Sequence, residues 1–236
     1  MSAPKRDMTT KEYPAFMKSH RSQFGGMLRR CVVAGALATA VASTLAVPFS
    51  AQATASSARA TVDPVAVQAA GVLVVLQRAD FARDATSFRS VDQTIDRIAD
   101  DIALRIMVDP ARLKLAWHAA DSEHQKALMA AFAQLGVPYR RNASQPGQAF
   151  DCSGLTTWAW AQAGFVLQRQ STAQIRAAAP RDETTAQAGD LVQYPGHVMM
   201  WLGVDRAIIH SPYTGRNVEV DVVSARHKVR FGDPTG

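Results

Sequence analysis

Hydrophobic positions follow two different periods along this chain. Between residues 62 and 135 they recur at helical spacing, and between residues 191 and 222 they form short runs bounded by turn residues. Asp63 followed by Pro64 has the residue types of a helix N-cap and first turn, so a helix is predicted to begin there. The pattern therefore predicts helices first and strands second.

A heptad repeat dominates the middle of the helical part. Apolar residues stand seven positions apart, with two more between them: Phe81, Phe88, Ile95, Ile102, Val91 and Ile98. Charged residues fill the other faces, so the pattern predicts an amphipathic helix with one apolar seam. Asp109 and Pro110 interrupt this helix and begin the next one. We favour a helical hairpin that stabilises its own domain, and the alternative is an arm that covers a cleft, dimerises or binds another protein.

The second half of the chain predicts an antiparallel sheet. Four short apolar runs are separated by turn residues: Leu191–Tyr194, His197–Leu202, Arg206–His210 and Val218–Val222. Because the connections between successive runs are short, neighbouring strands are expected to pair in antiparallel fashion. Helices followed by such a sheet are typical of the α+β class, which is the predicted fold.

A cysteine stands at the start of a helix between these two parts. The turn-rich residues 142–147 precede it, and Gly154–Ala163 has helical character, closed by Gly164. Unpaired N–H groups and the macrodipole at a helix N-terminus favour the thiolate, which is the nucleophilic form of cysteine. Cys152 is therefore a candidate nucleophile, and the alternative is that it is a small buried apolar residue.

The basic excess of the chain is confined to its first part. The formal net charge is +6, but residues 1–53 hold seven Lys and Arg against two acidic residues, and the remainder holds nineteen against eighteen. Since the excess belongs to this leader, nucleic acid is not expected as a partner.

The leader, residues 1–53, has the layout of a secretory signal peptide. Arg29 and Arg30 precede the uncharged run Val32–Val47, and Ala51-Gln52-Ala53 has the small residues of a cleavage site. The chain is therefore predicted to be exported, and either secreted or held in the cell envelope. The alternative is a membrane anchor, although the run is short of the about 20 residues that a span requires. If the leader is cleaved, no stable membrane span is expected.

Two histidines and one cysteine remain as candidate catalytic groups. Removal of the leader takes Cys31 with it and leaves Cys152 without a disulfide partner, which favours a working thiol in an exported protein. His197 begins one predicted strand and His210 ends the next, so the two imidazoles are within reach of each other in a hairpin of this length. A thiol, a base and an orienting group are the parts of nucleophilic catalysis. The alternative is that both histidines are structural.

Five sequence blocks together resemble a known family. In order, they are Gly136-Val137-Pro138-Tyr139, Phe150-Asp151-Cys152-Ser153-Gly154-Leu155, Ala188-Gly189-Asp190-Leu191-Val192, Gly196–Gly203 and Ile209-His210-Ser211-Pro212. This set resembles the NlpC/P60 family of cell-wall cysteine peptidases over about the last half of the chain. The resemblance implies a papain-like α+β fold without cofactor or metal. It also implies cleavage of peptidoglycan stem peptides, usually between D-γ-glutamate and meso-diaminopimelate or an equivalent diamino acid.

The resemblance also implies a role for each matching residue. Cys152 would be the nucleophile, His197 the base and His210 the orienting third residue. Tyr139 matches the tyrosine that helps to form the oxyanion site, with the backbone N–H of Cys152 as a second donor. Asp151 and Ser153 match positions that line the substrate cleft. Asp151 can also serve as the N-cap of the cysteine helix.

The chain departs from the family pattern in two places. Members commonly follow the tyrosine with Trp-Gly-Gly, whereas Arg140-Arg141-Asn142 stands here, and these arginines either meet substrate carboxylates or are simply solvated. A polar segment of the cleft wall is expected at residues 169–171. The second departure is that a helical arm takes the place of a wall-binding module, so a partner protein in the envelope is an alternative role for residues 62–120.

The sequence thus predicts four segments and one activity. They are a leader at 1–53, a linker at 54–61, a helical arm at 62–121 and a catalytic domain at 122–236. The predicted activity is hydrolysis of murein stem peptides through an acyl-enzyme. A catalytically silent wall-binding or scaffold protein and an acyltransferase or amidase on the same scaffold are the competing hypotheses.

Overall fold

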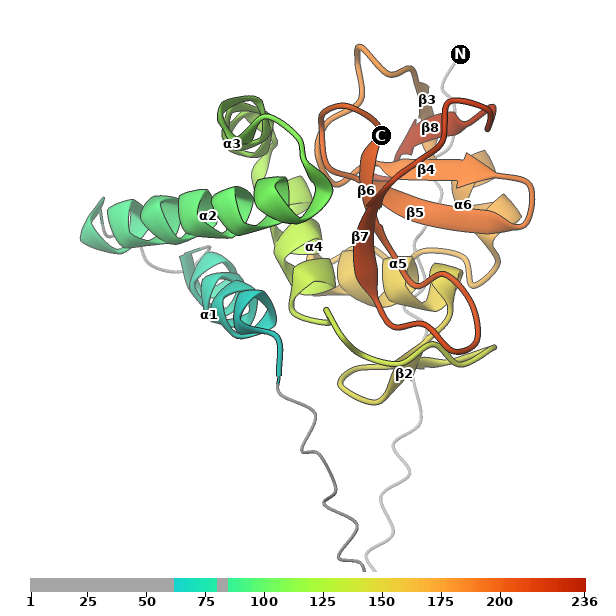
Figure 1. Cartoon of the computed structure of the whole chain (residues 1–236), viewed down its shortest axis with the longest axis horizontal. Coiled ribbons are helices and arrows are strands. Elements are labelled where there is room, and N and C mark those ends of the chain that lie inside the picture. The colour runs from blue at the N-terminus through green and yellow to red at the C-terminus, as the bar shows by residue number, and fades with distance from the viewer. Residues whose placement is uncertain (1–61, 80–84) are drawn as a thin grey trace, which may run out of the picture. The chain divides into compact units, whose positions relative to one another are not determined.

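A computed structural model describes residues 62–79 and 85–236 of the chain, and these form helices followed by a sheet (Figure 1). The predicted leader and linker, and Phe81 of the heptad repeat, lie outside the described residues. The helices are α1 (Pro64–Ala79), α2 (Ala85–Ile106), α3 (Pro110–Ala119), α4 (Ser122–Phe132), α5 (Cys152–Gln162) and α6 (Ser171–Ala177). The strands are β1 (Ser144–Gln145), β2 (Ala149–Phe150), β3 (Ala179–Arg181), β4 (Leu191–Tyr194), β5 (His197–Trp201), β6 (Ala207–His210), β7 (Glu219–Val222) and β8 (Arg230–Asp233).

Aspartate side chains cap helices α1, α3 and α4 at their N-termini. The Asp63 carboxylate accepts a hydrogen bond from the backbone N–H of Val65 at 2.9 Å, and Asp109 accepts one from Ala111 at 2.8 Å. Asp121 accepts from the N–H of His124 at 2.9 Å. Each cap satisfies a backbone donor that the helix itself leaves unpaired, so the predicted helix starts are confirmed.

The sheet has six strands in the order β3-β8-β4-β5-β6-β7, and every neighbouring pair is antiparallel. The four predicted strands are present as β4 to β7, and the α+β fold is confirmed. The sequence did not indicate β3 or β8. β8 is Arg-Phe-Gly-Asp, which has no apolar run, yet it lies inside the sheet between β3 and β4. Its pairing partners, rather than its own pattern, make it a strand.

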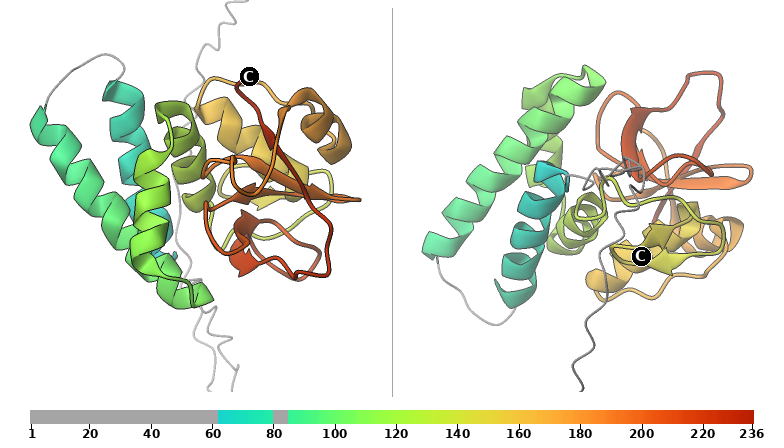
Figure 2. Two further views of the ribbon diagram at one scale, coloured as in Figure 1. Left: turned by 90° about the horizontal axis from the view of Figure 1, so that it is seen from above. Right: turned by 60° about the horizontal axis from the view of Figure 1, so that its bottom comes forward.

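Helices cover one face of this sheet (Figure 2). α5 packs on β5, and α6 packs on β4, β5 and β8. α4 lies between α5 on one side and α1 on the other, so helices from the arm and from the catalytic half are in contact. This position explains why residues 126–132 of α4 are all buried, although the sequence pattern indicated burial on one side only.

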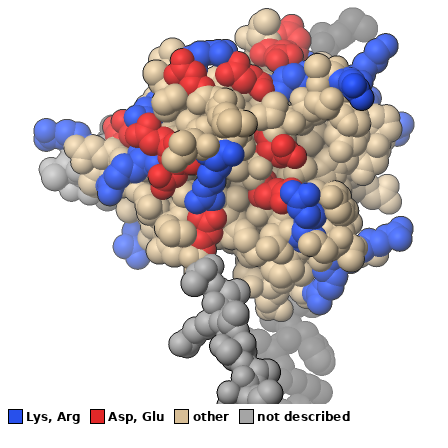
Figure 3. Space-filling model, viewed as in Figure 1, with Lys and Arg blue, Asp and Glu red and all other residues tan. Residues whose placement is uncertain are grey.

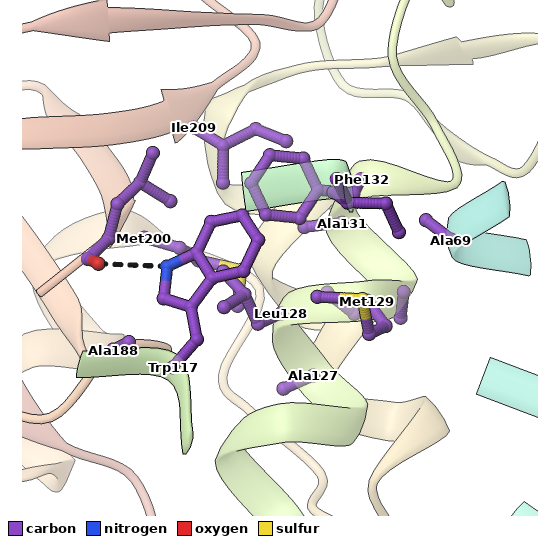
Figure 4. Close-up of a cluster of buried hydrophobic side chains, with 14 of the residues drawn as sticks. Ala69, Trp117, Ala127, Leu128, Met129, Ala131, Phe132, Ala188, Met200 and Ile209 are labelled. Carbon is purple, nitrogen blue, oxygen red and sulfur yellow. Dashed lines mark hydrogen bonds between the residues drawn. The ribbon is translucent and has the colours of Figure 1, made fainter. Parts of the chain in front are cut away.

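One hydrophobic core joins the arm to the sheet. Trp117 of α3 is 1% exposed and its indole N–H donates to the carbonyl of Leu202 at 3.0 Å, as Figure 4 shows. Its ring lies 5.0 Å from that of Phe132 between centroids. The same cluster extends from Val65 in α1 to Val218 near β7. The predicted boundary at residue 121 therefore falls between two helices that share a core.

The heptad seam packs inside the protein. Its described members Val91, Ile95, Ile98 and Ile102 are at most 5% exposed, and α2 contacts α1 and α3. Phe88 lies in α2, but its side chain is outside the described part. The seam is thus occupied by the protein's own helices, in agreement with the favoured hairpin interpretation, and it is not available to cover a cleft or to bind a partner.

Ion pairs connect the arm helices at their surfaces. Arg105 pairs with Asp63 at 2.6 Å and Lys114 with Asp100 at 2.7 Å, and acidic and basic side chains are interspersed on the face in Figure 3. Such exposed pairs contribute little, about 0–1 kcal/mol each, so burial of the seam accounts for most of the arm's stability. Within residues 62–79 and 85–236, no helix is both long and apolar enough to cross a bilayer.

Candidate active site

Cys152 is the first residue of α5, and its neighbours in the sequence build the start of that helix. Asp151 is the N-cap, and its Oδ1 accepts from the N–H of Gly154 at 2.7 Å. The carbonyl of Ala143 lies against the first turn of the helix, where it accepts from the Asp151 N–H at 3.0 Å. A Cβ on Gly154 would lie 2.0 Å from that carbonyl oxygen, so only glycine fits there. The motif places the thiol at a helix tip.

A cleft of about 550 Å³ opens beside the thiol. Four predicted site residues line it together, namely Tyr139, Asp151, Cys152 and Ser153. The expected polar segment, residues 169–171, lines it as well. Cys152 is only partly buried, so the thiol is open to a ligand and is not an inert core residue. Among the described residues of the arm, 62–79 and 85–120, none lines this cleft.

Arg169, in the cleft wall, forms hydrogen bonds with the two residues that flank Cys152. Its guanidinium donates to Ser153 Oγ at 2.8 Å and to Asp151 Oδ2 at 2.8 Å. The predicted ligand-contacting groups of Asp151 and Ser153 are therefore held in place by a charge-assisted network. Asp151 serves as N-cap with one carboxylate oxygen and as ion-pair partner with the other.

The two predicted histidines form a buried pair on neighbouring strands, and neither is among the residues that line this cleft. His197 begins β5 and His210 ends β6, and His197 Nε2 lies 2.9 Å from His210 Nδ1. His197 is 8% exposed and His210 is 9% exposed. Gly196, which directly precedes His197, lines the cleft beside Cys152, and α5 packs on β5. The sheet therefore holds the histidine pair next to the helix that carries the thiol.

The contact between the imidazoles engages Nε2 of His197 and leaves its Nδ1 outside this hydrogen bond. If His197 Nε2 carries the proton and donates to His210, then His197 Nδ1 has a free lone pair and His210 carries its proton on Nε2. That Nε2 atom is buried with no hydrogen-bond partner in the described structure. Glu219 Oε1 lies 3.6 Å from it, and Arg216 holds both oxygens of Glu219 at 2.6 and 3.0 Å.

Burial keeps both histidines neutral. It lowers the pKa of His197 to about 4, with a further contribution from the positive charge that His210 can carry. Burial likewise lowers the pKa of His210 to about 4, where Asp221 opposes the shift and Arg216 adds to it. At neutral pH His197 is therefore uncharged and able to accept a proton.

Two tyrosines lie near the thiol. Burial raises the pKa of Tyr139, and the negative charge of the Cys152 thiolate and of Asp151 raises it further. The pKa of Tyr194 is also raised, first by burial and then by Cys152. Tyr194 pairs with His197 across the β4–β5 turn, with ring centroids 5.3 Å apart. The sequence analysis missed Tyr194, although the two-residue turn between these positions implies their pairing.

Two groups of side chains have the atom types of metal ligands. His124, Asp190 and Asp233 are buried together, but both nitrogens of His124 already bond to carboxylates, Asp121 at 2.7 Å and Asp190 at 3.0 Å. This arrangement suits a protonated imidazole. In the second group, His210, Glu219 and Asp221, the arginine at position 216 occupies both carboxylate oxygens of Glu219. Both groups therefore fit hydrogen-bonded networks better than a cation site.

Comparison with known proteins places this site in a family. The model of the NlpC/P60 family matches residues 136–230, which include every predicted site residue. A probable endopeptidase of Corynebacterium glutamicum is 30% identical over 201 residues, covering 83% of this chain and 89% of that protein. The bifunctional muramidase/DL-endopeptidase CwlT of Bacillus subtilis is 39% identical over 79 residues, which cover 30% of this chain and 24% of CwlT.

The peptidoglycan endopeptidase RipA of Mycolicibacterium smegmatis is also similar, at 33% identity over 106 residues, covering 38% of this chain and 21% of RipA. The similarity to the corynebacterial protein extends beyond the cleft into the arm, since it covers most of both chains. The resemblance first indicated by the five sequence blocks is thereby confirmed. This chain belongs to the NlpC/P60 family and is a cysteine peptidase.

Proposed function

We propose that the protein is an exported endopeptidase that hydrolyses the stem peptides of peptidoglycan through a thioester on Cys152. The bond proposed to break joins D-γ-glutamate to diaminopimelate or an equivalent diamino acid. The similarity to CwlT, a DL-endopeptidase, and to RipA, a peptidoglycan endopeptidase, supports this substrate. The observation that carries the proposal is a partly buried thiol at a helix N-terminus in an open cleft, on a helix that packs against the strand that begins with His197 of the histidine pair.

Acylation follows from this arrangement. His197 takes the proton from the Cys152 thiol, and the thiolate attacks the γ-carbonyl carbon of the glutamyl residue. The Tyr139 hydroxyl and the backbone N–H of Cys152 are the proposed donors to the oxyanion that forms. When the carbon–nitrogen bond breaks, His197 returns its proton to the departing amine, and the glutamyl group remains on sulfur as a thioester.

Deacylation restores the enzyme. A water molecule gives a proton to His197 and its oxygen attacks the thioester carbon. The carbon–sulfur bond then breaks, the glutamyl carboxylate leaves and the thiol regains its proton. In this proposal His210 keeps the imidazole of His197 in one orientation throughout, through the contact between His197 Nε2 and His210 Nδ1 at 2.9 Å.

Digestion of defined muropeptides tests the reaction. Purified protein is expected to release one new free amine per bond cleaved, and mass spectrometry of the separated products identifies that bond. Cys152→Ala is expected to abolish the release while leaving the fold intact, because its side chain is only partly buried. Wild-type protein that yields no more amine than this variant would contradict the enzymatic proposal and favour a silent scaffold. A product extended by an acceptor amine would instead indicate acyl transfer.

Export is the second part of the proposal. It is supported by the charged, apolar and small-residue segments of the leader. A fusion of residues 1–60 to a reporter that is active only outside the cytoplasm is expected to give signal, and replacement of Val32–Val47 by polar residues is expected to remove it. Equal signal from both fusions would argue against a signal peptide.

A further inference from the structure

The charges that line the cleft do not balance. Three charged side chains line it, namely Arg141, Asp151 and Arg169. Asp151 and Arg169 form an ion pair at 2.8 Å, and Arg169 also bonds to Ser153. Arg141 is exposed, and among the described residues its guanidinium contacts no hydrogen-bond or ion-pair partner. The cleft therefore has one unpaired positive charge, and it resides on Arg141.

The loop that carries Arg141 is fixed on both sides. The N–H of Arg140 donates to the carbonyl of Phe150 at 2.9 Å, and the N–H of Ala143 donates to the carbonyl of Arg140 at 3.1 Å. Asn142 completes the turn with a φ of 61°. The Arg141 charge is also close enough to Tyr139 to act against the rise in that residue's pKa. The backbone that carries Arg141 is thus anchored, and Arg141 lines the same cleft as Tyr139 and Cys152.

Arg140, the residue next to Arg141, has different surroundings. Arg140 is exposed too, but its guanidinium donates to Gln145 Oε1, and Arg140 does not line the cleft. Two adjacent residues of the same type therefore have different surroundings. The sequence left open whether these arginines meet a substrate or are solvated. In the structure Arg141 lines the cleft and Arg140 does not.

A γ-glutamyl linkage leaves a carboxyl group for such a cation. When the γ-carboxyl of glutamate forms the peptide bond, its α-carboxyl stays outside the chain, a few bonds from the carbon that the thiolate attacks. As a carboxylate it is a planar acceptor that matches the fork of a guanidinium. As a carboxamide it has no charge, and a bound carboxamide leaves the guanidinium less well paired.

We propose that Arg141 binds this free α-carboxylate and makes the enzyme select stem peptides whose glutamyl residue is not amidated. The inference rests on the proposed function, because it takes the γ-glutamyl bond as the one cleaved. Arg141 is a specificity-determining residue in this proposal. It contacts the substrate beside the reacting carbon and takes no part in proton transfer.

Two synthetic stem peptides that differ only in this group test the proposal. One has the glutamyl α-carboxylate and the other has the α-carboxamide. Wild-type kcat/KM is expected to be about tenfold or more higher for the carboxylate peptide, in keeping with a charge-assisted hydrogen bond. Arg141→Gln is expected to lose this preference by reacting more slowly with the carboxylate peptide only. Arg140→Gln, the matched control, is expected to keep the wild-type preference.

Binding without turnover separates this inference from the proposed function. Calorimetry with Cys152→Ala is expected to show tighter binding of the carboxylate peptide, and the Cys152→Ala, Arg141→Gln double variant is expected to bind both peptides alike.

If wild-type protein hydrolyses both peptides equally well, the proposed role of Arg141 is wrong and the proposed endopeptidase activity stands. If it hydrolyses neither but Cys152→Ala still discriminates between them, the proposed reaction is wrong and the carboxylate site stands. Loss of preference in Arg140→Gln would also overturn the assignment.

Discussion

At the scale of single residues, the active site depends on polar atoms that have more than one partner. Asp151 caps α5 with one oxygen and pairs with Arg169 through the other. His210 meets His197 with one nitrogen and turns the other toward Glu219. The Glu219 contact arises from strand pairing, because these residues lie directly opposite each other in β6 and β7. A negative charge this close to the histidine pair stabilises the positive charge that the pair gains when it is protonated.

Glu219→Gln is expected to slow the reaction of the thiol. Transfer of the Cys152 proton to His197 places a positive charge on the histidine pair, and the Glu219 carboxylate 3.6 Å from His210 favours that charge. Without it we expect a threefold to tenfold lower rate of alkylation by iodoacetamide at pH 7, because a shift of about half a unit to one unit in the pKa of the pair corresponds to this factor.

Glu183→Gln is the matched control for this experiment. Glu183 also lies 3.6 Å from a cationic side chain, that of Arg206, but it is at the surface and outside the cleft. Its alkylation rate is expected to equal that of the wild type. Equal rates for all three proteins would show that Glu219 does not act on the pair.

At the scale of elements, the helix α4 is joined to the sheet by a buried ionic network. His124 is fully buried and lies between Asp121 at its own helix start and Asp190 before β4. Burial alone would lower the pKa of His124, but the hydrogen bonds that its ring donates to Asp190 and Asp121 outweigh burial and raise the pKa above its ordinary value. The network therefore favours the protonated form of His124, which lies in the core of the protein.

The free energy of unfolding is expected to fall as the pH rises from 6.5 toward 9. A pKa that folding raises contributes stability fully below the unfolded value of 6.5, and this contribution is lost as the pH rises through the folded value. His197 and His210 have folded pKa values near 4, so they are neutral in both states over most of this range and add little to the slope. Urea unfolding at a series of pH values measures the decline.

Two histidine variants test whether His124 causes this decline in the free energy of unfolding. His124→Gln is expected to be less stable overall, and its remaining stability is expected to depend much less on pH between 6.5 and 9. His118→Gln is the control, since His118 is paired with Asp96 at the surface at 2.8 Å. A wild-type slope that persists in His124→Gln would place its origin elsewhere.

At the scale of the whole molecule, the arm helices are part of the folding unit that holds the site. Trp117 of α3 is bonded to Leu202 just after β5, the strand that begins with His197. The core cluster runs without a break from α1 to the sheet. The arm therefore supports the strand that begins with His197, although none of the arm residues that the structure describes lines the cleft.

Trp117→Ala is expected to destabilise the whole protein by about 3–5 kcal/mol, the usual cost of removing a buried aromatic side chain. Leu115→Ala on the same helix is the control, because Leu115 is 72% exposed and such changes usually cost less than about 0.5 kcal/mol. Urea unfolding measures both. A cost for Trp117→Ala near that of Leu115→Ala, or a folded and active protein lacking residues 62–120, would show that the arm is dispensable.

Local signals in the sequence were sufficient for much of this fold. Helix starts depend on one capping side chain and its nearest neighbours, so Asp63, Asp109 and Asp151 identified them. The four apolar strands and the thiol at a helix tip followed from periodicity and turn residues. β8 could not be found in this way, because its four residues have no pattern of their own and become a strand only between two others.

The sequence by itself determined the fold class, the order of the arm helices, the cysteine helix and strands β4 to β7, the candidate nucleophile and the family, because each shows in local residue patterns. Only the tertiary structure decided that the heptad seam packs inside the protein, that Glu219 lies behind His210 and that Arg141 rather than Arg140 faces the cleft. These contacts join segments through strand register and loop anchoring, and the partners that a side chain meets across such distances are set by packing of the whole chain.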